Sequence, residues 1–590
     1  MKKFTMLSSV LASALMLTVA SCSSSDDITG GNGGENAEST TSYLVINLNS
    51  VGNAPASRAY TQGGGLYDDG ETLENKINKV RFYFYNADGT AYKLQNTGAN
   101  GVSQNWIDQD VTTETGDQSV TVSGKTQAVL VLNGESNVSP ASMLAVVNPE
   151  VGSSQLDGIM VSRWSKMRTE LTGKTFHDEN GFVMTNSTYE DGGKDLCTTL
   201  LAGRTYSTKD KALDNPVNVY VERVNAKVKA SIAADNTNFA KVTTDEKVDG
   251  VNFNGKYKTK VGDLTVTKSD GSTEDIPVFA YIEAWGVADE NDQATYYKQI
   301  DVQNWTDATL GFEDTPWSSR DYHRCFWSKG IAFGGTPVHL PANHPFSEYK
   351  ANLGDALYTL PNTPTNYNGT YDNPMKSELT KFLVTARLAY TDASGNILPA
   401  EICTYNGQKF LGQDKVKKVI ADGLGTYYKM TTSATETTTY TKIEPTDIEF
   451  STTTDGSLKL QDYQVVAKLK SSITELYRMS GGSYVAADMA VVKKEVQALP
   501  VEIHNGGRTY YYTPIKHLGK PRSIAEYGIV RNHSYQVDLN SIQGFGTPVY
   551  DPDKNIIPIV PSDDLTYLAA RINVLSWRVV PSKVNLDATK

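Results

Sequence analysis

The sequence predicts an all-β protein with a few short helices, and three features of the chain predict it. The 590 residues include 33 Tyr and 47 Gly, against 16 Phe and 7 Trp. Tyr favours strands, and Gly favours the turns between them. Short apolar runs of strand length recur between turn residues, whereas helical spacing of apolar residues is only local. At roughly 150 residues per domain, this length allows two to four domains.

Four apolar runs are expected to form strands. They are Tyr43–Leu48, Lys79–Tyr85, Gln127–Asn133 and the stretch from Val217 to Val228. In the first run, alternation places Leu44, Ile46 and Leu48 on one face. The second run closes in a turn, residues 86–89. The run Tyr510–Tyr512 could stack on a sugar, but a core strand with one exposed Tyr is the favoured interpretation.

Two segments are expected to be helical. Between Asp488 and Pro500, one face carries Met489, Val492, Val496 and Leu499. This spacing is that of a helix with one apolar face. The segment from Gln155 to Leu171 is expected to add a second short helix.

A weak internal sequence similarity bears on the domain organisation. Lys381–Tyr390, followed by the turn residues Asp392–Gly395, resembles the strand at Val80 and its turn. Two β domains in tandem, joined between residues 300 and 330, would explain this similarity. Coincidence remains the open alternative.

The N-terminus has the pattern of an export signal. Lys2 and Lys3 precede a short apolar stretch, Met6–Ala20, which is too short to span a membrane. The small residues before Cys22 make the motif resemble a bacterial lipobox, with Cys22 as the acylated first residue of the processed protein. An ordinary secretory signal cut near Ala20 is the alternative. A polar tether then runs to about Ser42.

Charge and motifs exclude several classes of function. The formal charge of −12 argues against nucleic acid or an anionic lipid surface as a partner. Compact metal-ligand, nucleophile and phosphate-loop motifs are absent from the sequence, so we expect neither catalysis nor a cofactor. His339 and His344 are too widely splayed to favour a metal site. Cys197, Cys325 and Cys403 are widely spaced, which favours buried or unpaired thiols over a disulfide framework.

The C-terminal end has the composition of a strand. It follows a connector rich in Pro and Asp, residues 548–564, and its residues alternate in character. One face carries Asn573, Leu575, Trp577 and Val579, and the other carries Ile572, Val574 and Val580. Such a strand either pairs with its own sheet or reaches a neighbouring molecule. An ordinary last strand of the last domain fits the composition equally well.

Several stretches spread over the whole chain resemble one protein family. They are the Cys22 motif, the first strand before Arg58, Lys79–Gly89, Val219–Val228, Leu360–Thr363, Val530–Val537 with Gly544–Gly546, and Ile572–Val579. In order and spacing they resemble the major fimbrillins of Bacteroidales, the type V pilins, and most closely the Mfa-type members. The resemblance implies two tandem transthyretin-like β-sandwich domains.

The resemblance also implies a domain organisation. It consists of a signal peptide (1–21), a lipidated propeptide with a removable first strand (22–58), an N-terminal β-sandwich (59–310), a C-terminal β-sandwich (311–564) and a donor strand (565–590). An Arg-specific protease would cut the Arg58–Ala59 bond. Of the residues around this bond, only Arg58 itself indicates the cleavage site. Arg81 and Arg223 also end candidate sites, but both fall inside expected strands and should be protected.

Strand exchange is the assembly that the resemblance implies. Loss of the first strand would remove Leu44, Ile46 and Leu48 and leave a template for another strand. A neighbour's donor strand would fill it, using Ile572, Val574, Leu575, Trp577 and Val579. Because head-to-tail insertion does not close on itself, an open filament results.

The expected function is that of a structural, non-enzymatic stalk subunit of a fimbria that supports adhesion and biofilm formation. The precursor is expected at the outer membrane as a lipoprotein, and the mature protein in the surface fimbrium. Its expected partners are other copies of itself, accessory fimbrial subunits, the maturation protease, and host or bacterial surface receptors. An accessory subunit at the tip or base is the first alternative, and a surface glycan-binding lipoprotein is the second.

Overall fold

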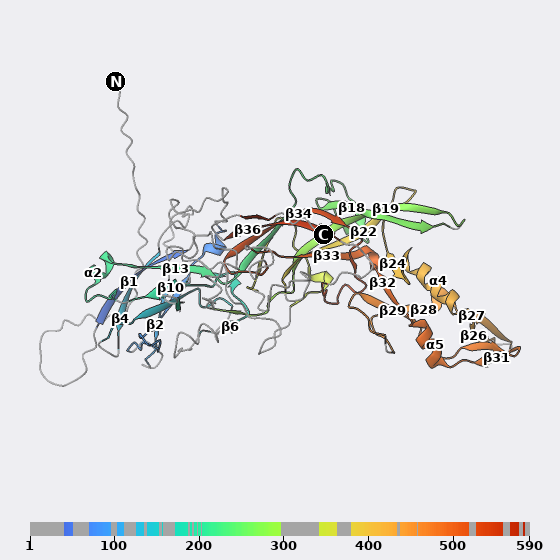
Figure 1. The fold of residues 1–590 in the computed structure, drawn as a ribbon, viewed down its shortest axis with the longest axis horizontal. Helices are drawn as coiled ribbons and strands as arrows, with labels where there is room; N and C mark the ends of the chain where they lie inside the picture. The colour runs from blue at the N-terminus through green and yellow to red at the C-terminus, as the bar shows by residue number, and fades with distance from the viewer. Residues whose placement is uncertain are drawn as a thin grey trace, which may run out of the picture.

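The computed structural model describes most of the chain between residues 41 and 584. The described residues are 41–50, 70–95, 103–110, 126–134, 138–152, 156, 172–186, 189–191, 194–196, 199–201, 203–268, 270–296, 342–362, 379–433, 437–456, 458–517, 527–558, 567–576 and 582–584. Figure 1 shows an elongated arrangement, with an N-terminal sheet, a central sandwich and a distal lobe along the long axis.

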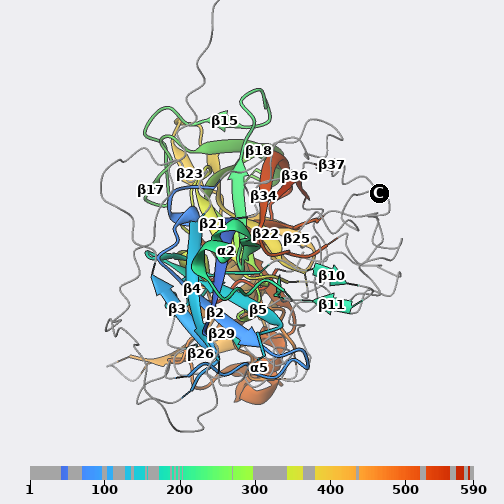
Figure 2. The same ribbon diagram turned by 90° about the vertical axis from the view of Figure 1, so that its left-hand side faces the viewer.

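The N-terminal sheet has the strand order β3-β2-β5-β9-β13-β1-β4, with β12 paired to β5. Its strands are β1 (Thr41–Ser50), β2 (Lys79–Tyr85), β3 (Trp106–Asp110), β4 (Thr126–Asn133), β5 (Ser142–Val147), β9 (Met184–Asn186), β12 (Thr199–Leu200) and β13 (Val217–Arg223). In β4, Leu130 and Leu132 are buried, whereas Val131 between them is exposed. This alternation of period two gives the strand one core face. Figure 2 shows this sheet towards the viewer.

The N-terminal sheet curls, so that its two outer strands are linked. Leu94 forms β-bridges both to Gly134, just after β4, and to Gln104, just before β3. The curled sheet encloses one apolar cluster, which includes Leu44, Ile46, Phe82, Leu130, Met143, Phe182 and Val219. Burial of this cluster is what selects the strand register, since a one-residue slip would turn every apolar side chain outward.

Two sheets form the central sandwich. The first has the order β21-β14-β34-β36-β37, and the second β15-β18-β19-β22-β33-β35, with β23 paired to β22. The first contains β14 (Ala226–Ser231), β21 (Ala356–Thr359), β34 (His533–Gln543), β36 (Tyr567–Ser576) and β37 (Ser582–Val584). The second contains β15 (Ala240–Lys241), β18 (Tyr257–Thr267), β19 (Thr273–Ala288), β22 (Lys381–Thr391), β23 (Ile397–Pro399), β33 (Arg508–Pro514) and β35 (Thr547–Pro548).

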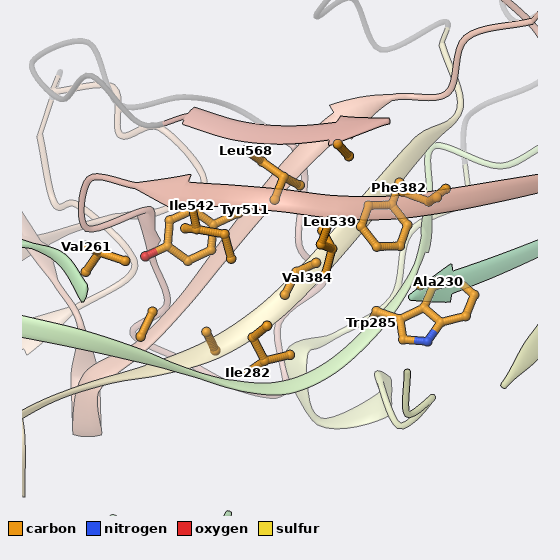
Figure 3. Packing of buried hydrophobic residues seen from close by; sticks show 14 of the residues in the cluster. Ala230, Val261, Ile282, Trp285, Phe382, Val384, Tyr511, Leu539, Ile542 and Leu568 are labelled. Carbon is orange, nitrogen blue, oxygen red and sulfur yellow. The ribbon is translucent and has the colours of Figure 1, made fainter. Parts of the chain in front are cut away.

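Apolar side chains from both central sheets meet in one core (Figure 3). Phe382 and Val384 of β22 pack there with residues of β34, such as Leu539. Trp285 of β19 is 1% exposed and donates its indole N–H to the Asn352 carbonyl at 2.7 Å. This bond removes the cost of burying the polar end of the ring.

The distal lobe is inserted between β23 and β33. Its sheets are β25-β24-β32-β29-β28 and β27-β26-β30-β31. Its strands are β24 (Ile402–Tyr405), β25 (Gln408–Leu411), β26 (Tyr427–Thr432), β27 (Thr438–Lys442), β28 (Ile448–Ser451), β29 (Gln464–Leu469), β30 (Tyr477–Ser480), β31 (Ser483–Ala486) and β32 (Pro500–Ile503). The helices α4 (Gln413–Gly423) and α5 (Met489–Val496) contribute to its core.

The remaining described elements are short. Two-stranded pairs are β6 (Thr172–Gly173) with β20 (Ala294–Thr295), β7 (His177–Asp178) with β8 (Gly181–Phe182), β10 (Tyr189–Asp191) with β11 (Lys194–Leu196), and β16 (Lys247–Val248) with β17 (Val251–Asn252). One further helix is α2 (Lys209–Asp214), and the 3-10 turns are η2 (Leu73–Asn75), η7 (Phe346–Glu348), η8 (Pro445–Asp447) and η9 (Asn505–Gly507). In the part of the chain that the structure describes, no helix is long and apolar enough to cross a membrane.

The all-β prediction is confirmed, and most of the expected strands lie where the sequence puts them. The helix at Met489–Val496 is confirmed, with Asp488 as its N-cap. The helix expected from Gln155 to Leu171 falls almost wholly outside the described residues, and α4 was not predicted. The expectation of one exposed Tyr in β33 was wrong, because Tyr510, Tyr511 and Tyr512 are all buried against core neighbours.

The expected strand from Val217 to Val228 is two strands, and the chain changes sheets between them. β13 ends at Arg223 in the N-terminal sheet, and β14 begins at Ala226 in the central sandwich. This change of sheet comes earlier than the domain junction expected between residues 300 and 330. The central sandwich therefore takes strands from before residue 310 as well as after it.

Candidate assembly site

The first strand, β1, lies between two other strands of the N-terminal sheet. It runs antiparallel to β4, with pairs from Thr41↔Asn133 to Leu48↔Thr126. It runs parallel to β13, with pairs from Ile46↔Val217 to Ser50↔Val221. Nearer its start, Tyr43 exchanges backbone hydrogen bonds with Tyr206 at 2.7 and 2.9 Å. Both edges of β1 are therefore engaged, and its backbone polar groups are satisfied from both sides.

Three consecutive side chains in the middle of β1 are buried, so the strand is covered on both faces there. Leu44, Val45 and Ile46 are each 0% exposed. Leu44 and Ile46 belong to the core cluster inside the curled sheet. The helix α2 lies against β1, and its N-cap Thr208 accepts a hydrogen bond from the Lys211 backbone N–H. The strand is thus part of the core, although it comes first in the folded chain.

Without β1, the sheet would present a slot of strand width between β4 and β13. Unpaired N–H and C=O groups would line both sides, and the pockets of Leu44 and Ile46 would form its floor. Such an edge pair is a template for another extended chain. The arrangement can therefore bind a strand by main-chain hydrogen bonding, with alternate side chains giving specificity.

The last long strand, β36, lies in the central sandwich of its own chain. It runs antiparallel to β34 along its whole length, from His533↔Ser576 to Gln543↔Tyr567. Near its start, Leu568 and Ala570 are buried in the sandwich core. Along its other edge, the partner among the described residues is the three-residue strand β37. In this structure the C-terminal strand is therefore docked on its own sheet, close to the edge.

The family comparison falls on this C-terminal region. Residues 502–582 match the family described as major fimbrial subunit protein type IV, fimbrillin, C-terminal. The match spans β33, β34, β35 and β36. The chain carries a fimbrillin C-terminal region. The predicted resemblance to fimbrillins is confirmed, and it supports a fimbrial subunit at the cell surface.

Solved structures with distant similarity include fimbrial proteins. The chain resembles a candidate cell adhesion protein from Parabacteroides distasonis at 10% identity, covering 91% of this chain and 97% of that one, with a TM-score of 0.35. It resembles the tip fimbrial protein Mfa3 from Porphyromonas gingivalis, with C-terminal truncation, at 11% identity, covering 91% and 100%, with a TM-score of 0.28. With TM-scores this low, these likenesses carry no argument. No curated protein matches the chain.

The predicted site residues of this chain fall into three groups. Leu44 and Ile46 are buried in β1, and Leu48 lies in β1 opposite Val219 and Thr126. The donor residues within β36 are Ile572, Val574 and Leu575. Those outside the described residues are Cys22, Arg58, Ala59, Trp577 and Val579.

The two competing arginine sites lie in strands, as the sequence predicts. Arg81 of β2 is 7% exposed and holds Asp108 through two hydrogen bonds of 2.6 and 2.8 Å. Arg223 of β13 is 6% exposed and donates from Nε to the Glu74 carbonyl at 2.7 Å. A protease needs an extended, accessible backbone, so we expect the peptide bonds after Arg81 and Arg223 to be protected in the folded protein.

Sequence reasoning missed a buried ion pair between the turn η2, which precedes β2, and the central sandwich. Glu74 of η2 and Lys227 of β14 are both 0% exposed, and Nζ lies 2.7 Å from Oε1. Tyr358 donates its hydroxyl proton to the same carboxylate at 2.5 Å. Burial alone would raise the pKa of Glu74, but the hydrogen bonds from Lys227 and Tyr358 outweigh it and lower that pKa. The segment after the expected cleavage bond is thereby anchored to the body of the protein.

Candidate residues for other chemistry are not assembled into a site. Among the described residues, no group of three or more His, Cys, Asp or Glu could hold a metal ion. His344 lies beside Glu290 and Glu348, at 3.6 and 3.4 Å. Cys403 is buried, and this burial raises the pKa of its thiol, which makes it a poor nucleophile. His339, Cys197 and Cys325 lie outside the described residues.

Proposed function

We propose that the chain is the stalk subunit of a type V fimbria and polymerises by strand exchange. The observation that carries the proposal is the position of β1. It is the first described strand, it is buried on both faces, and it lies between β4 and β13. The candidate cleavage bond Arg58–Ala59 follows it by only a few residues. A single cut there separates β1 from the rest of the chain.

Maturation begins with a lipoprotein precursor held at the outer membrane through Cys22. An Arg-specific protease then cuts after Arg58. The ion pair between Glu74 and Lys227 keeps the new N-terminal segment attached to the body, so that only the propeptide leaves. The precursor is a closed subunit because β1 occupies its own slot.

The vacated slot provides the driving force for assembly. Each large aliphatic side chain that returns to the floor of the slot contributes about 1.5–3 kcal/mol. Leu44 and Ile46 are two such positions, and Val45 fills the opposite face. Backbone hydrogen bonds to both β4 and β13 add to this gain. Association and the ordering of the donor segment oppose it.

The donor is the C-terminal strand of a neighbouring copy. A subunit with both a removable first strand and a donor strand can have a neighbour at each end, so the filament grows without closing. An accessory subunit at the tip or base would need only one of the two features. The filament would carry adhesion and biofilm formation at the cell surface.

The test is treatment of the purified precursor with an Arg-specific protease. We expect Ala59 as the new N-terminus and a ladder of multimers on SDS gels of unboiled samples. Arg58→Ala should abolish both. Arg58→Lys is the matched control, because it keeps the positive charge but not the recognised residue. A chain ending at Asp564 should be cut but should not form the ladder.

Other outcomes assign other functions. Clean cleavage with monomer only would indicate an accessory subunit. Resistance of the Arg58–Ala59 bond in the folded precursor would contradict the proposed maturation. It would favour a stable surface lipoprotein, for which a glycan array is the next experiment.

A further inference from the structure

The first and last strands share a short sequence. Residues 46–50 of β1 are Ile-Asn-Leu-Asn-Ser, and residues 572–576 of β36 are Ile-Asn-Val-Leu-Ser. Both strands have ten residues, and both end at the Ser of this motif. When the two strands are superimposed end to end, the motifs coincide. The C-terminal strand therefore matches β1 at the Ile, Asn and Ser of this motif, and the first three positions of the motif in β1 are the ones that pair with both β4 and β13.

The Asn of this motif occupies a distinctive position in the N-terminal sheet. Asn47 is paired with Asn218 of β13 on one side and with Gln127 of β4 on the other. Paired positions share a face of the sheet, so three amide residues form one row across three strands. Amide groups at neighbouring positions can donate and accept hydrogen bonds among themselves. An apolar residue in the middle position could not.

We propose that β36 of a neighbouring copy enters the slot with Asn573 in the place of Asn47, and that Asn573 sets this register. The proposal rests on the proposed strand exchange and specifies the alignment of the two strands. It places Ile572 where Ile46 lies and Val574 where Leu48 lies. The donor then runs parallel to β13 and antiparallel to β4, as β1 does.

A competing register would use the other face of the C-terminal strand. Leu575, Trp577 and Val579 would then take the places of Leu44, Ile46 and Leu48. Ile46 is fully buried, so Trp577 in its place would overpack the floor of the slot. Arg578 would interrupt the amide row. The register with Asn573 in the row avoids both problems.

One feature opposes the proposed register. Arg571 would take the place of Val45, which is buried in the precursor. Val45 pairs with Val129 of β4, whereas pairing with β13 begins only at Ile46. Tyr206 bonds the same edge of β1 at Tyr43, so Val45 lies at a short break in the pairing on that edge. The match between donor and slot therefore begins at Ile572, and the wall of the slot must yield at Val45 to seat Arg571, whose apolar stem can pack there while its guanidinium group extends to water.

Asn573 also has an amide partner before assembly. In the sandwich of its own chain it is paired with Gln536 of β34. On moving to the slot it exchanges this neighbour for Gln127 and Asn218. Asn573 is thus paired with amide residues in both registers, so the transfer does not place it opposite an apolar residue.

Disulfide mapping in the full chain tests the register. Thr126 is opposite Leu48, so the register puts Val574 of the neighbour opposite Thr126. The double variant Thr126→Cys, Val574→Cys, made with Cys197→Ser and Cys325→Ser, is cleaved and allowed to assemble. We expect a ladder that survives boiling without reductant and collapses with it. The matched controls combine Thr126→Cys with Leu575→Cys or Val579→Cys, and these should stay unlinked.

The role of Asn573 is tested by substitution. Asn573→Leu and Asn218→Leu should each lower the yield of multimers roughly two- to fivefold and weaken the link between positions 126 and 574. Asn573→Gln should retain both. A link through position 579, or an unchanged yield and link in Asn573→Leu, would overturn the inference while leaving strand exchange intact. If no variant forms multimers after cleavage, the proposed function itself fails, and the inference falls with it.

Discussion

Ile46 of β1 is paired with Val217 of β13 on one side and with Ala128 of β4 on the other. Its side chain is 0% exposed within the core of the curled sheet. The first strand among the described residues therefore contributes fully buried side chains to the core of the N-terminal sheet. Removal of such a strand leaves a slot of defined width and polarity, which is the basis of the proposed assembly.

Truncation of Ile46 should destabilise the precursor. Ile46→Ala leaves a cavity in a closed core, so we expect the free energy of unfolding of the N-terminal sheet to fall by about 2–5 kcal/mol. Val131→Ala is the matched control, since Val131 lies on the neighbouring strand but is 45% exposed. Its effect should stay within about 0.5 kcal/mol. Urea unfolding of the uncleaved precursor measures both, and equal losses would contradict the assigned burial.

The ion pair between Glu74 and Lys227 should make the free energy of unfolding depend on pH in the acid range. The pKa of Glu74 lies below its ordinary value of 4.5 in the folded protein. As the pH falls below about 4.5, the unfolded chain binds a proton while folded Glu74 stays ionised. The stabilisation by Glu74 is therefore fully present above this pH and is lost as the pH falls through the lower, folded pKa.

Substitution of Glu74 isolates this contribution. Glu74→Gln leaves the buried Lys227 without its carboxylate and should cost about 3–5 kcal/mol at pH 7. The difference from the parent should shrink as the pH falls below 4.5. Glu71→Gln is the control, because Glu71 is 65% exposed where it faces Lys229. Unfolding free energies measured from pH 7 to 3 give both curves, and a constant difference would contradict the account.

Glycine should be required at position 507, because the backbone of Leu388 packs closely against it. It has a φ of +76°, and a Cβ there would lie 2.3 Å from the Leu388 carbonyl oxygen. Gly507→Ala should therefore destabilise the central sandwich by more than the strain of a positive φ alone, which is about 1 kcal/mol. Gly395→Ala isolates that strain, since Gly395 has a φ of +85° with open space around it. Thermal unfolding of both variants compares them, and equal shifts would refute the steric explanation.

The sequence predicts the strand β1 well, but it predicts the strands and corners around β1 poorly. Alternation of Leu44, Ile46 and Leu48 is a local property, so β1 could be recognised without the fold. The corner between β13 and β14 could not. It depends on Arg223 contacting Asn532, more than 300 residues away, through a hydrogen bond of 3.2 Å. No Gly or Pro in the stretch from Val219 to Val228 marks the change of sheet at Val224.

Burial of Glu74 was equally invisible in the sequence. It lies in a polar stretch that resembles an exposed linker, and only the fold brings Lys227 and Tyr358 to it. Helix α4 differs, because Val416 and Ile420 have helical spacing and are buried on one face. This signal was present and was overlooked. Short amphipathic helices in β-rich chains are easily missed because two or three apolar residues carry the whole helical pattern.

Hydrogen exchange of the backbone tests the central claim most directly. Peptides covering residues 126–133 and 217–223 are measured in the precursor, the cleaved monomer and the assembled multimer. The account predicts protection in the precursor, loss of protection after β1 leaves, and renewed protection on assembly. Protection that persists in the cleaved monomer, or that fails to return in the multimer, would contradict the exchange of β1 for a neighbour's strand.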